Sequence, residues 1–249
     1  MKIMKILFIG DSIIKGSQGV NFVKLVSKHF PTFQITNLGI DGESLNLISK
    51  RLLNHLKKVN DYDYIILEGG AGDIALPTFL EKGKLFEFAY RHQLKKGIIP
   101  LTNSADFHSF MNITIREVKG KFNGKLILLT LGCLNEKLDS KLNFKREEYN
   151  QVIKQLSKEQ NILLADPGIL VNDFFKAKTQ NDFYYGNFWS VAYTDRIFTL
   201  FNRGARYLSK KRNLWLTIDG VHLNEKGAEL FAQSIINLLE IEMQQLALR

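Results

Sequence analysis

Cysteine is nearly absent from this 249-residue sequence, and histidine and proline are scarce. A single cysteine, Cys133, excludes an internal disulfide and any cysteine-rich metal site. The five histidines do not recur at metal-ligand spacing, so we expect no bound metal. No glycine-rich phosphate loop follows an apolar run, and we expect no cofactor. Any chemistry must therefore come from the chain's own side chains.

Long apolar runs are also missing, and no stretch approaches the ~18 residues of a membrane-spanning helix. The first ten residues are basic and then apolar, as in a signal peptide, but their apolar run is shorter than the roughly 7–15 residues of that element. We therefore expect a cytoplasmic protein without a transmembrane segment. Peripheral contact with a membrane surface stays open.

Basic residues exceed acidic ones by 34 to 25, which gives a net charge of +9. Many of the lysines are scattered over helical patterns, as on an ordinary solvated surface. One denser basic cluster consists of Arg203, Arg206, Lys210, Lys211 and Arg212. It could bind an anionic glycan or a membrane surface, whereas nucleic acid is not expected because no further basic and aromatic recognition motif accompanies it.

Short apolar runs alternate with amphipathic helical patterns, which indicates βαβ units and a parallel sheet. Strands are expected at residues 5–9, 33–37, 64–67, 125–131 and 162–165. Helices are expected at residues 21–29 and 44–58, as a pair within 78–119, at 146–160 and from about 225 to 244. The pattern predicts an α/β fold, a three-layer sandwich around a central parallel sheet of about five strands.

No repeat, low-complexity tract or linker interrupts this alternation, so residues 1–249 are expected to form one domain. Residues 172–213 depart from the alternation because they are rich in aromatic residues, among them Trp189. We interpret this segment as an insertion. It would form either a subsidiary hydrophobic cluster or a wall or lid of a substrate pocket.

Two motifs far apart in the chain supply the residue types of a hydrolytic triad. Ser12 ends a Gly-Asp-Ser motif directly after the first apolar run, where a strand-to-helix turn favours negative charge. Asp219 and His222 belong to an Asp-Gly-Val-His motif just before the last predicted helix. A serine hydroxyl becomes nucleophilic when an imidazole, held in one tautomer by a carboxylate, removes its proton.

These motifs resemble those of the SGNH hydrolases, also called the GDSL esterase/lipase family. Residues 10–12 match the block with the nucleophile, residues 37–42 (Asn-Leu-Gly-Ile-Asp-Gly) match the glycine block, and residues 219–224 with Gly227 match the final block. The resemblance spans roughly residues 5–73, 125–166 and 217–240. It implies the flavodoxin-like fold of this family.

By this resemblance, Ser12 would be the nucleophile, His222 the general base and then general acid, and Asp219 the group that orients the imidazole. Backbone N–H groups of Ser12 and Gly39 would stabilise the oxyanion, and a glycine leaves room for that approach. Further candidates for substrate binding are Asp11, Asp73 and Trp189.

The third block departs from the family pattern. The family usually shows Gly-x-Asn-Asp, whereas residues 70–73 read Gly-Ala-Gly-Asp, so Gly72 stands at the asparagine position. Loss of one oxyanion donor lowers turnover by about 10²–10³. Either the Gly72 N–H, a water or a side chain such as Asn46 or Asn103 replaces the amide, or activity is weak or lost. We also expect Gly70 and Gly72 to leave extra room beside the nucleophile.

The sequence thus predicts a serine esterase that hydrolyses a short acyl ester, on a carbohydrate or another polar alcohol, through an acyl-enzyme intermediate. Its partner would be a small acyl-ester or acylated-carbohydrate substrate. Two alternatives remain open at this point. One is acyl transfer to a sugar hydroxyl by the same triad. The other is a catalytically weak or silent binding protein on the same scaffold, suggested by Gly72.

Overall fold

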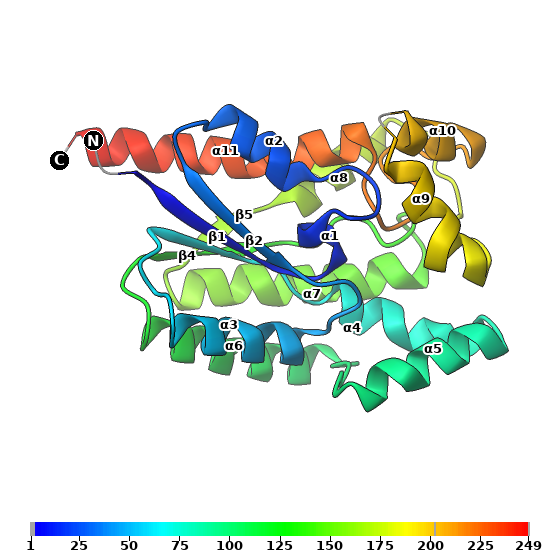
Figure 1. Cartoon of the computed structure of the whole chain (residues 1–249), viewed down its shortest axis with the longest axis horizontal. Helices are drawn as coiled ribbons and strands as arrows, with labels where there is room; N and C mark the ends of the chain where they lie inside the picture. The colour runs from blue at the N-terminus through cyan, green and yellow to red at the C-terminus, as the bar shows by residue number, and fades with distance from the viewer. Residues whose placement is uncertain (1–2, 202, 249) are drawn as a thin grey trace.

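The computed structural model of the chain describes residues 3–201 and 203–248. Its centre is a five-stranded parallel sheet with the strand order β2-β1-β3-β4-β5 (Figure 1). The strands are β1 (Lys5–Gly10), β2 (Gln34–Gly39), β3 (Tyr64–Leu67), β4 (Lys125–Leu129) and β5 (Leu163–Ala165). The order reverses between β1 and β3, and open α/β sheets bind ligands beyond the carboxyl ends of the strands at such a point.

Helices cover both faces of this sheet (Figure 1). One face is covered by α2 (Phe22–His29), α8 (Pro167–Lys176) and α11 (Glu225–Ala247). The other is covered by α3 (Leu45–Leu56), α6 (Ser104–Lys119) and α7 (Lys141–Glu159). The predicted three-layer α/β sandwich with about five parallel strands is therefore confirmed.

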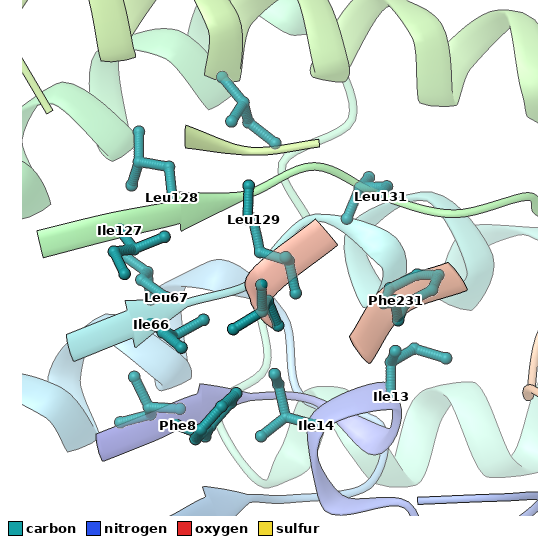
Figure 2. Close-up of a cluster of buried hydrophobic side chains, with 14 of the residues drawn as sticks. Phe8, Ile13, Ile14, Ile66, Leu67, Ile127, Leu128, Leu129, Leu131 and Phe231 are labelled. Carbon is teal, nitrogen blue, oxygen red and sulfur yellow. The ribbon is translucent and has the colours of Figure 1, made fainter. Parts of the chain in front are cut away.

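The core lies on both sides of the sheet, because strands of a parallel sheet are buried on both faces and are apolar almost throughout. Leu7 and Phe8 of β1 point to opposite faces, and both are fully buried. Ile13 and Ile14, directly after Ser12, belong to the same cluster, together with Phe231 of α11 (Figure 2). Burial of each such side chain contributes about 1.5–3 kcal/mol. The turn that carries Ser12 is therefore packed firmly onto the core.

No helix was predicted where α8 lies, and its first residues are Pro167 and Gly168. A proline is compatible with the first turn of a helix, where its missing N–H would have no partner. Asp166 caps this helix by accepting a hydrogen bond from the Ile169 N–H at 3.0 Å. The expected insertion at residues 172–213 therefore begins inside a helix.

The rest of that segment contains an irregular stretch, the π-helical turn η2 (Ser190–Thr194), α9 (Asp195–Thr199) and α10 (Gly204–Lys211). These elements lie at the end of the molecule toward which β1 points, as does α5 (Lys84–Lys95) on the other side of the sheet edge (Figure 1). In the part of the chain described here, no helix is both long and apolar enough to cross a membrane.

Candidate active site

Ser12 is the first residue of the short helix α1 (Ser12–Lys15), which follows β1 after a single residue. The Asp11 carboxylate caps this helix by accepting a hydrogen bond from the Ile13 N–H at 2.9 Å. From the neighbouring strand β2, the Asn37 amide donates to the Ile14 carbonyl at 2.7 Å. The register pairs Gly10 with Gly39, so β1 and β2 end at the same level. These contacts fix the orientation of Ser12 at the carboxyl edge of the sheet.

Asp219 and His222 lie on a loop just before α11. The Asp219 carboxylate folds this loop onto itself by accepting the N–H groups of Val221 at 3.0 Å and His222 at 2.8 Å. Gly220 has a φ of 91°, a left-handed conformation that favours glycine. The loop thus presents the imidazole toward the end of β1.

The structure brings the three predicted triad residues together. His222 Nδ1 lies 2.7 Å from Asp219 Oδ2, and His222 Nε2 lies 3.1 Å from Ser12 Oγ. Both distances lie within the range of hydrogen bonds. Asp219 and His222 are buried. The arrangement can hold the imidazole in one tautomer and let it accept the serine proton.

The two buried members of this group shift each other's pKa. Burial alone would lower the pKa of His222, but the adjacent Asp219 carboxylate outweighs it and holds that pKa above its usual value. Burial would raise the pKa of Asp219, but His222 and the loop N–H groups hold it below its usual value. Asp219 is therefore ionised beside an imidazole that binds a proton readily.

Three residues that the sequence did not single out support this loop. Gln18 donates from Nε2 to Asp219 Oδ2 at 3.1 Å. The Tyr185 N–H donates to the Asp219 carbonyl at 2.8 Å, and its ring lies 6.1 Å from the imidazole. The fully buried Glu136 accepts the N–H groups of residues 215–217 at 2.6–2.8 Å, which anchors the segment before Asp219. Gln18 and Tyr185 line the cavity described below.

The predicted oxyanion donors are arranged differently from the expectation. The Ser12 N–H has no acceptor within the described residues and remains available at the start of α1. The Gly39 N–H instead donates to Asn37 Oδ1 at 2.9 Å, and Gly39 does not line the cavity. An asparagine side chain readily closes such a turn two residues on. The prediction that Gly39 is an oxyanion donor is therefore not supported by this geometry.

Gly72 lies in the short helix α4 (Ala71–Ala75) and lines the cavity, and its N–H donates to Asp11 Oδ2 at 3.3 Å. A Cβ on this residue would overlap the main-chain oxygen of Glu43. A Cβ on Gly70 would meet the Phe107 ring at 3.1 Å. The expectation of extra room at these glycines is wrong, because neighbouring atoms already fill the space that a side chain would occupy.

The proposed substitutes for the amide lie elsewhere. Asn46 accepts the Ile99 N–H at 3.2 Å and donates to the Gly97 carbonyl at 2.9 Å. Asn103 caps α6 by accepting the Asp106 N–H at 2.8 Å. Neither lines the cavity. Asn46 thus holds the distant backbone at residues 97–99, and Asn103 holds the first turn of α6.

Of the two aspartates predicted to bind substrate, only Asp11 lines the cavity. Asp73 is buried and accepts the N–H groups of Leu45 at 2.9 Å and Leu101 at 2.8 Å. Burial raises the pKa of Asp73 to about 7, and the nearby Asp11 adds to this rise. Burial and Asp11 likewise raise the pKa of Glu68, whose Oε2 accepts the Asp11 N–H at 3.1 Å. Asp73 therefore joins the start of α3 to the chain at Leu101 and does not line the cavity.

The cavity in front of Ser12 and His222 has a volume of about 310 Å³. One part of its wall is polar and includes Gln18, Asp41, Gln93 and Arg196. Another part is apolar and is formed by Ala75, Leu76, Phe79, Tyr185, Val191 and Ala192. Several of these residues come from the 172–213 segment, which thus forms a wall of the cavity. Trp189 lies outside it, largely exposed and stacked on Tyr193 at 5.7 Å between ring centres.

The basic cluster does not form one surface. Arg212 turns inward, where it binds the buried Asp195 through two hydrogen bonds of 2.7 and 2.8 Å and donates to the Ile218 carbonyl at 2.6 Å. Arg206 pairs with Glu225 at 3.3 Å. A larger cavity of about 820 Å³, which Arg206 and Lys210 line beside Trp215, does not contain the triad. Within the described ranges, no group of three or more His, Cys, Asp and Glu residues could hold a metal ion.

Comparison with known proteins gives one family and a set of similar structures. The model of the GDSL-like lipase/acylhydrolase family matches residues 8–230. A variant of Axe2, an acetyl xylan esterase from Geobacillus stearothermophilus, is 18% identical, with a TM-score of 0.62 over 95% of this chain and 96% of that chain. The acetyl xylan esterase AlAXEase is 19% identical, with a TM-score of 0.61 over 94% and 98% of the two chains.

LAE5, an α/β hydrolase from the metagenome of Lake Arreo in Spain, is 14% identical, with a TM-score of 0.63 over 94% of each chain. No curated protein matches the chain. At identities this low, the similarity to these structures supports the assignment of the fold and nothing further.

Proposed function

The chain belongs to the GDSL-like lipase/acylhydrolase family, and from this premise we propose that it is a serine esterase acting on short acyl esters. The observation that carries the proposal is the continuous line of hydrogen bonds from Ser12 through His222 to Asp219, which opens into a cavity. This line forms only when the strands, the α1 turn and the loop before α11 place the three side chains next to one another.

In the proposed reaction, Ser12 Oγ attacks the ester carbonyl carbon while His222 Nε2 takes the hydroxyl proton. The tetrahedral intermediate collapses as the alcohol leaves with the proton from His222, and an acyl-serine ester remains. Water then attacks this ester, gives a proton to His222, and releases the carboxylic acid as Ser12 regains its proton. Asp219 stays ionised throughout and stabilises the imidazolium.

For the oxyanion we propose two main-chain donors. The Ser12 N–H has no acceptor among residues 3–201 and 203–248, and it lies at the amino end of the short helix α1, where the peptide dipoles favour negative charge. The Gly72 N–H is the second, because Gly72 lines the cavity and its hydrogen bond to Asp11 is long, at 3.3 Å. A developing oxyanion would compete with the Asp11 carboxylate for the Gly72 N–H. The neutral carbonyl of the bound ester would compete less well, so this donor would favour the transition state.

The cavity wall supports a short acyl group on a polar alcohol. A volume of about 310 Å³ lies near the lower end of ligand pockets. The apolar wall with Phe79 and Tyr185 suits the acyl group, and the polar wall with Asp41 and Arg196 suits hydroxyl groups of the alcohol. The acetyl xylan esterases among the similar structures agree with an acetylated carbohydrate as substrate.

A fluorophosphonate probe tests the proposal without knowledge of the natural substrate. We expect the wild type to be labelled on Ser12 and to hydrolyse p-nitrophenyl acetate, and Ser12→Ala to do neither. Ser17→Ala is the matched control, because Ser17 lines the same cavity but bonds to Asp41 rather than to His222. It should retain labelling. Equal labelling of wild type and Ser12→Ala, or none of the folded wild type, would contradict the proposal.

A further inference from the structure

The segment formed by η2 and α9 exposes an apolar stripe at helical spacing. The stripe consists of Trp189, Tyr193, Ile197, Leu200 and Phe201, which are 58, 57, 56, 75 and 69% exposed. Apart from the last pair, which are adjacent, its members are three or four residues apart, so they share one face of the helical segment. A surface helix of a globular protein normally carries polar residues on its solvent-exposed face.

The opposite face of the same segment is fixed toward the protein. Asp195 is buried and paired with Arg212, and Val191 and Ala192 line the catalytic cavity. The charged residue thus points inward and the large apolar ones point outward. A rotation of the segment that buried the stripe would have to break the Asp195–Arg212 pair. The exposure of the stripe is therefore a fixed feature of the fold.

Exposed cations lie near this stripe. Residues 182–212 contain six Lys and Arg residues against two Asp residues. Arg212 is bound to the buried Asp195, Arg206 pairs with Glu225, and the half-exposed Arg196 lies 3.8 Å from Asp41. The other three, Arg203, Lys210 and Lys211, are exposed. On the far side, Lys82 and Lys84 line a surface depression together with Leu85 and Trp189. Lys82 donates to the Tyr184 carbonyl at 2.7 Å, whereas Lys84 is exposed. The apolar stripe therefore has exposed cations near it, and the start of α5, which carries Lys84, lies at the same end of the molecule (Figure 1).

We propose that this face docks onto an anionic lipid bilayer. Trp and Tyr side chains prefer the membrane–water interface, Ile, Leu and Phe side chains enter the acyl boundary, and Lys and Arg attract anionic headgroups. The stripe and its rim supply all three. A second copy of the chain fits less well, because a symmetric contact would place two basic surfaces against each other.

Docking in this way would bring the catalytic cavity to the bilayer surface, because the inner side of the same segment lines that cavity. The binding itself requires no catalysis. It can therefore be measured whether or not the chain is an esterase.

Vesicle co-sedimentation tests the proposal. We expect wild type to bind vesicles of phosphatidylcholine with phosphatidylglycerol, to bind pure phosphatidylcholine much more weakly, and to be released by salt. Ile197→Ser should weaken partitioning about fivefold and the double variant Leu200→Ser/Phe201→Ser at least about tenfold, since burial of apolar area drives insertion. Ile113→Ser on α6 is the matched control, because Ile113 and Ile197 are both 56% exposed. It should bind as wild type does.

Tryptophan emission reports the docking site directly, because Trp189 and Trp215 are the two tryptophans of the chain. In a Trp215→Phe background, anionic vesicles should shift the Trp189 emission to shorter wavelength. No vesicle binding by wild type, or equal weakening by Ile113→Ser and Ile197→Ser, would overturn the proposal. A dimer that the stripe variants abolish, without vesicle binding, would instead make this face a contact between two copies.

Discussion

The main-chain oxygen of Glu43 occupies the space into which a Cβ atom on Gly72 would project. Members of the family usually carry an asparagine at this position of the third block, so its absence suggests at first a lost oxyanion donor. The close approach gives a different reason for the glycine. In this chain the loop that contains Glu43 packs directly on α4, and a side chain at position 72 would force the two apart.

We therefore expect Gly72→Asn to lower both stability and esterase activity instead of restoring an oxyanion donor. Backbone atoms cannot move aside as the end of a side chain can, so a loss of about 1–3 kcal/mol in the free energy of unfolding is expected. Urea unfolding measures it. Gly120→Ala is the control, because a Cβ there meets its neighbours at an ordinary 3.6 Å. Higher activity in Gly72→Asn at unchanged stability would show that the asparagine fits.

The buried pair of Arg212 and Asp195 holds two parts of the 172–213 segment together, and Arg212 also donates to the Ile218 carbonyl just before Asp219. Arg212→Met should lower the free energy of unfolding by about 3–5 kcal/mol, because it leaves the Asp195 carboxylate buried without its partner. The double variant Arg212→Met/Asp195→Leu should recover most of this loss, since it removes both charges. Chemical unfolding of the three proteins checks this. If the double variant is no more stable than the single one, the pair is not what holds the segment.

The strands and the two motifs that carry Ser12, Asp219 and His222 could be read from the sequence because their signals are local. Apolar runs of strand length and a serine directly after the first of them are visible in the sequence. Parallel pairing then forces the ends of β1 and β2 to one edge, which needs no knowledge of side-chain packing. Helix α8 was not predicted, and its Pro167 stands in the first turn, where a proline is compatible with a helix.

The supports of the site could not be predicted in this way. Gln18 meets Asp219 across 201 positions, and Glu136 meets Leu216 across 80. Neither residue belongs to a motif, and each acquires its partner only when distant loops fold together. Likewise, the lack of room for a side chain at position 72 depends on the tertiary position of the Glu43 main chain. Local patterns identified the side chains that meet at the candidate site, whereas tertiary contacts decide which groups hold them.

Gln18 is expected to act as a positioning residue through its hydrogen bond to Asp219. Gln18→Ala should lower kcat about fivefold, because Asp219 loses a contact that orients it. The change should also raise the apparent pKa of the acid limb of the kcat/KM profile. A carboxylate without this donor attracts the imidazolium proton more strongly, and the pKa of His222 is already held above its usual value. As the pH is lowered, the variant therefore loses activity at a higher pH than the wild type does.

The pH profile separates this role from a merely structural one. Gln93→Ala is the comparison, because Gln93 lines the same cavity, and its side chain has no hydrogen bond to Ser12, His222 or Asp219 within the described part of the chain. It should leave the acid limb where it is, whatever it does to KM. An acid limb that does not move in Gln18→Ala would mean that Gln18 does not influence the imidazole.

Asp73 should make the stability of the protein depend on pH in an unusual direction. Burial raises its pKa to about 7 in the folded chain, above the value of about 3.9 in an unfolded chain. The folded state therefore binds this proton more tightly. The resulting stabilisation is fully present below the unfolded pKa, declines as the pH rises between the two values, and is gone above about pH 7.

The comparison of wild type with Asp73→Asn isolates this effect, since other titrating groups contribute alike to both proteins. Asparagine does not ionise, so the stability of wild type relative to the variant should fall with a slope of up to about 1.4 kcal/mol per pH unit between about pH 4 and 7. The variant's imperfect hydrogen bonds to Leu45 and Leu101 would add a constant offset. Urea unfolding at a series of pH values measures the difference. A difference that stays constant over this range would mean that Asp73 does not hold its proton near neutral pH.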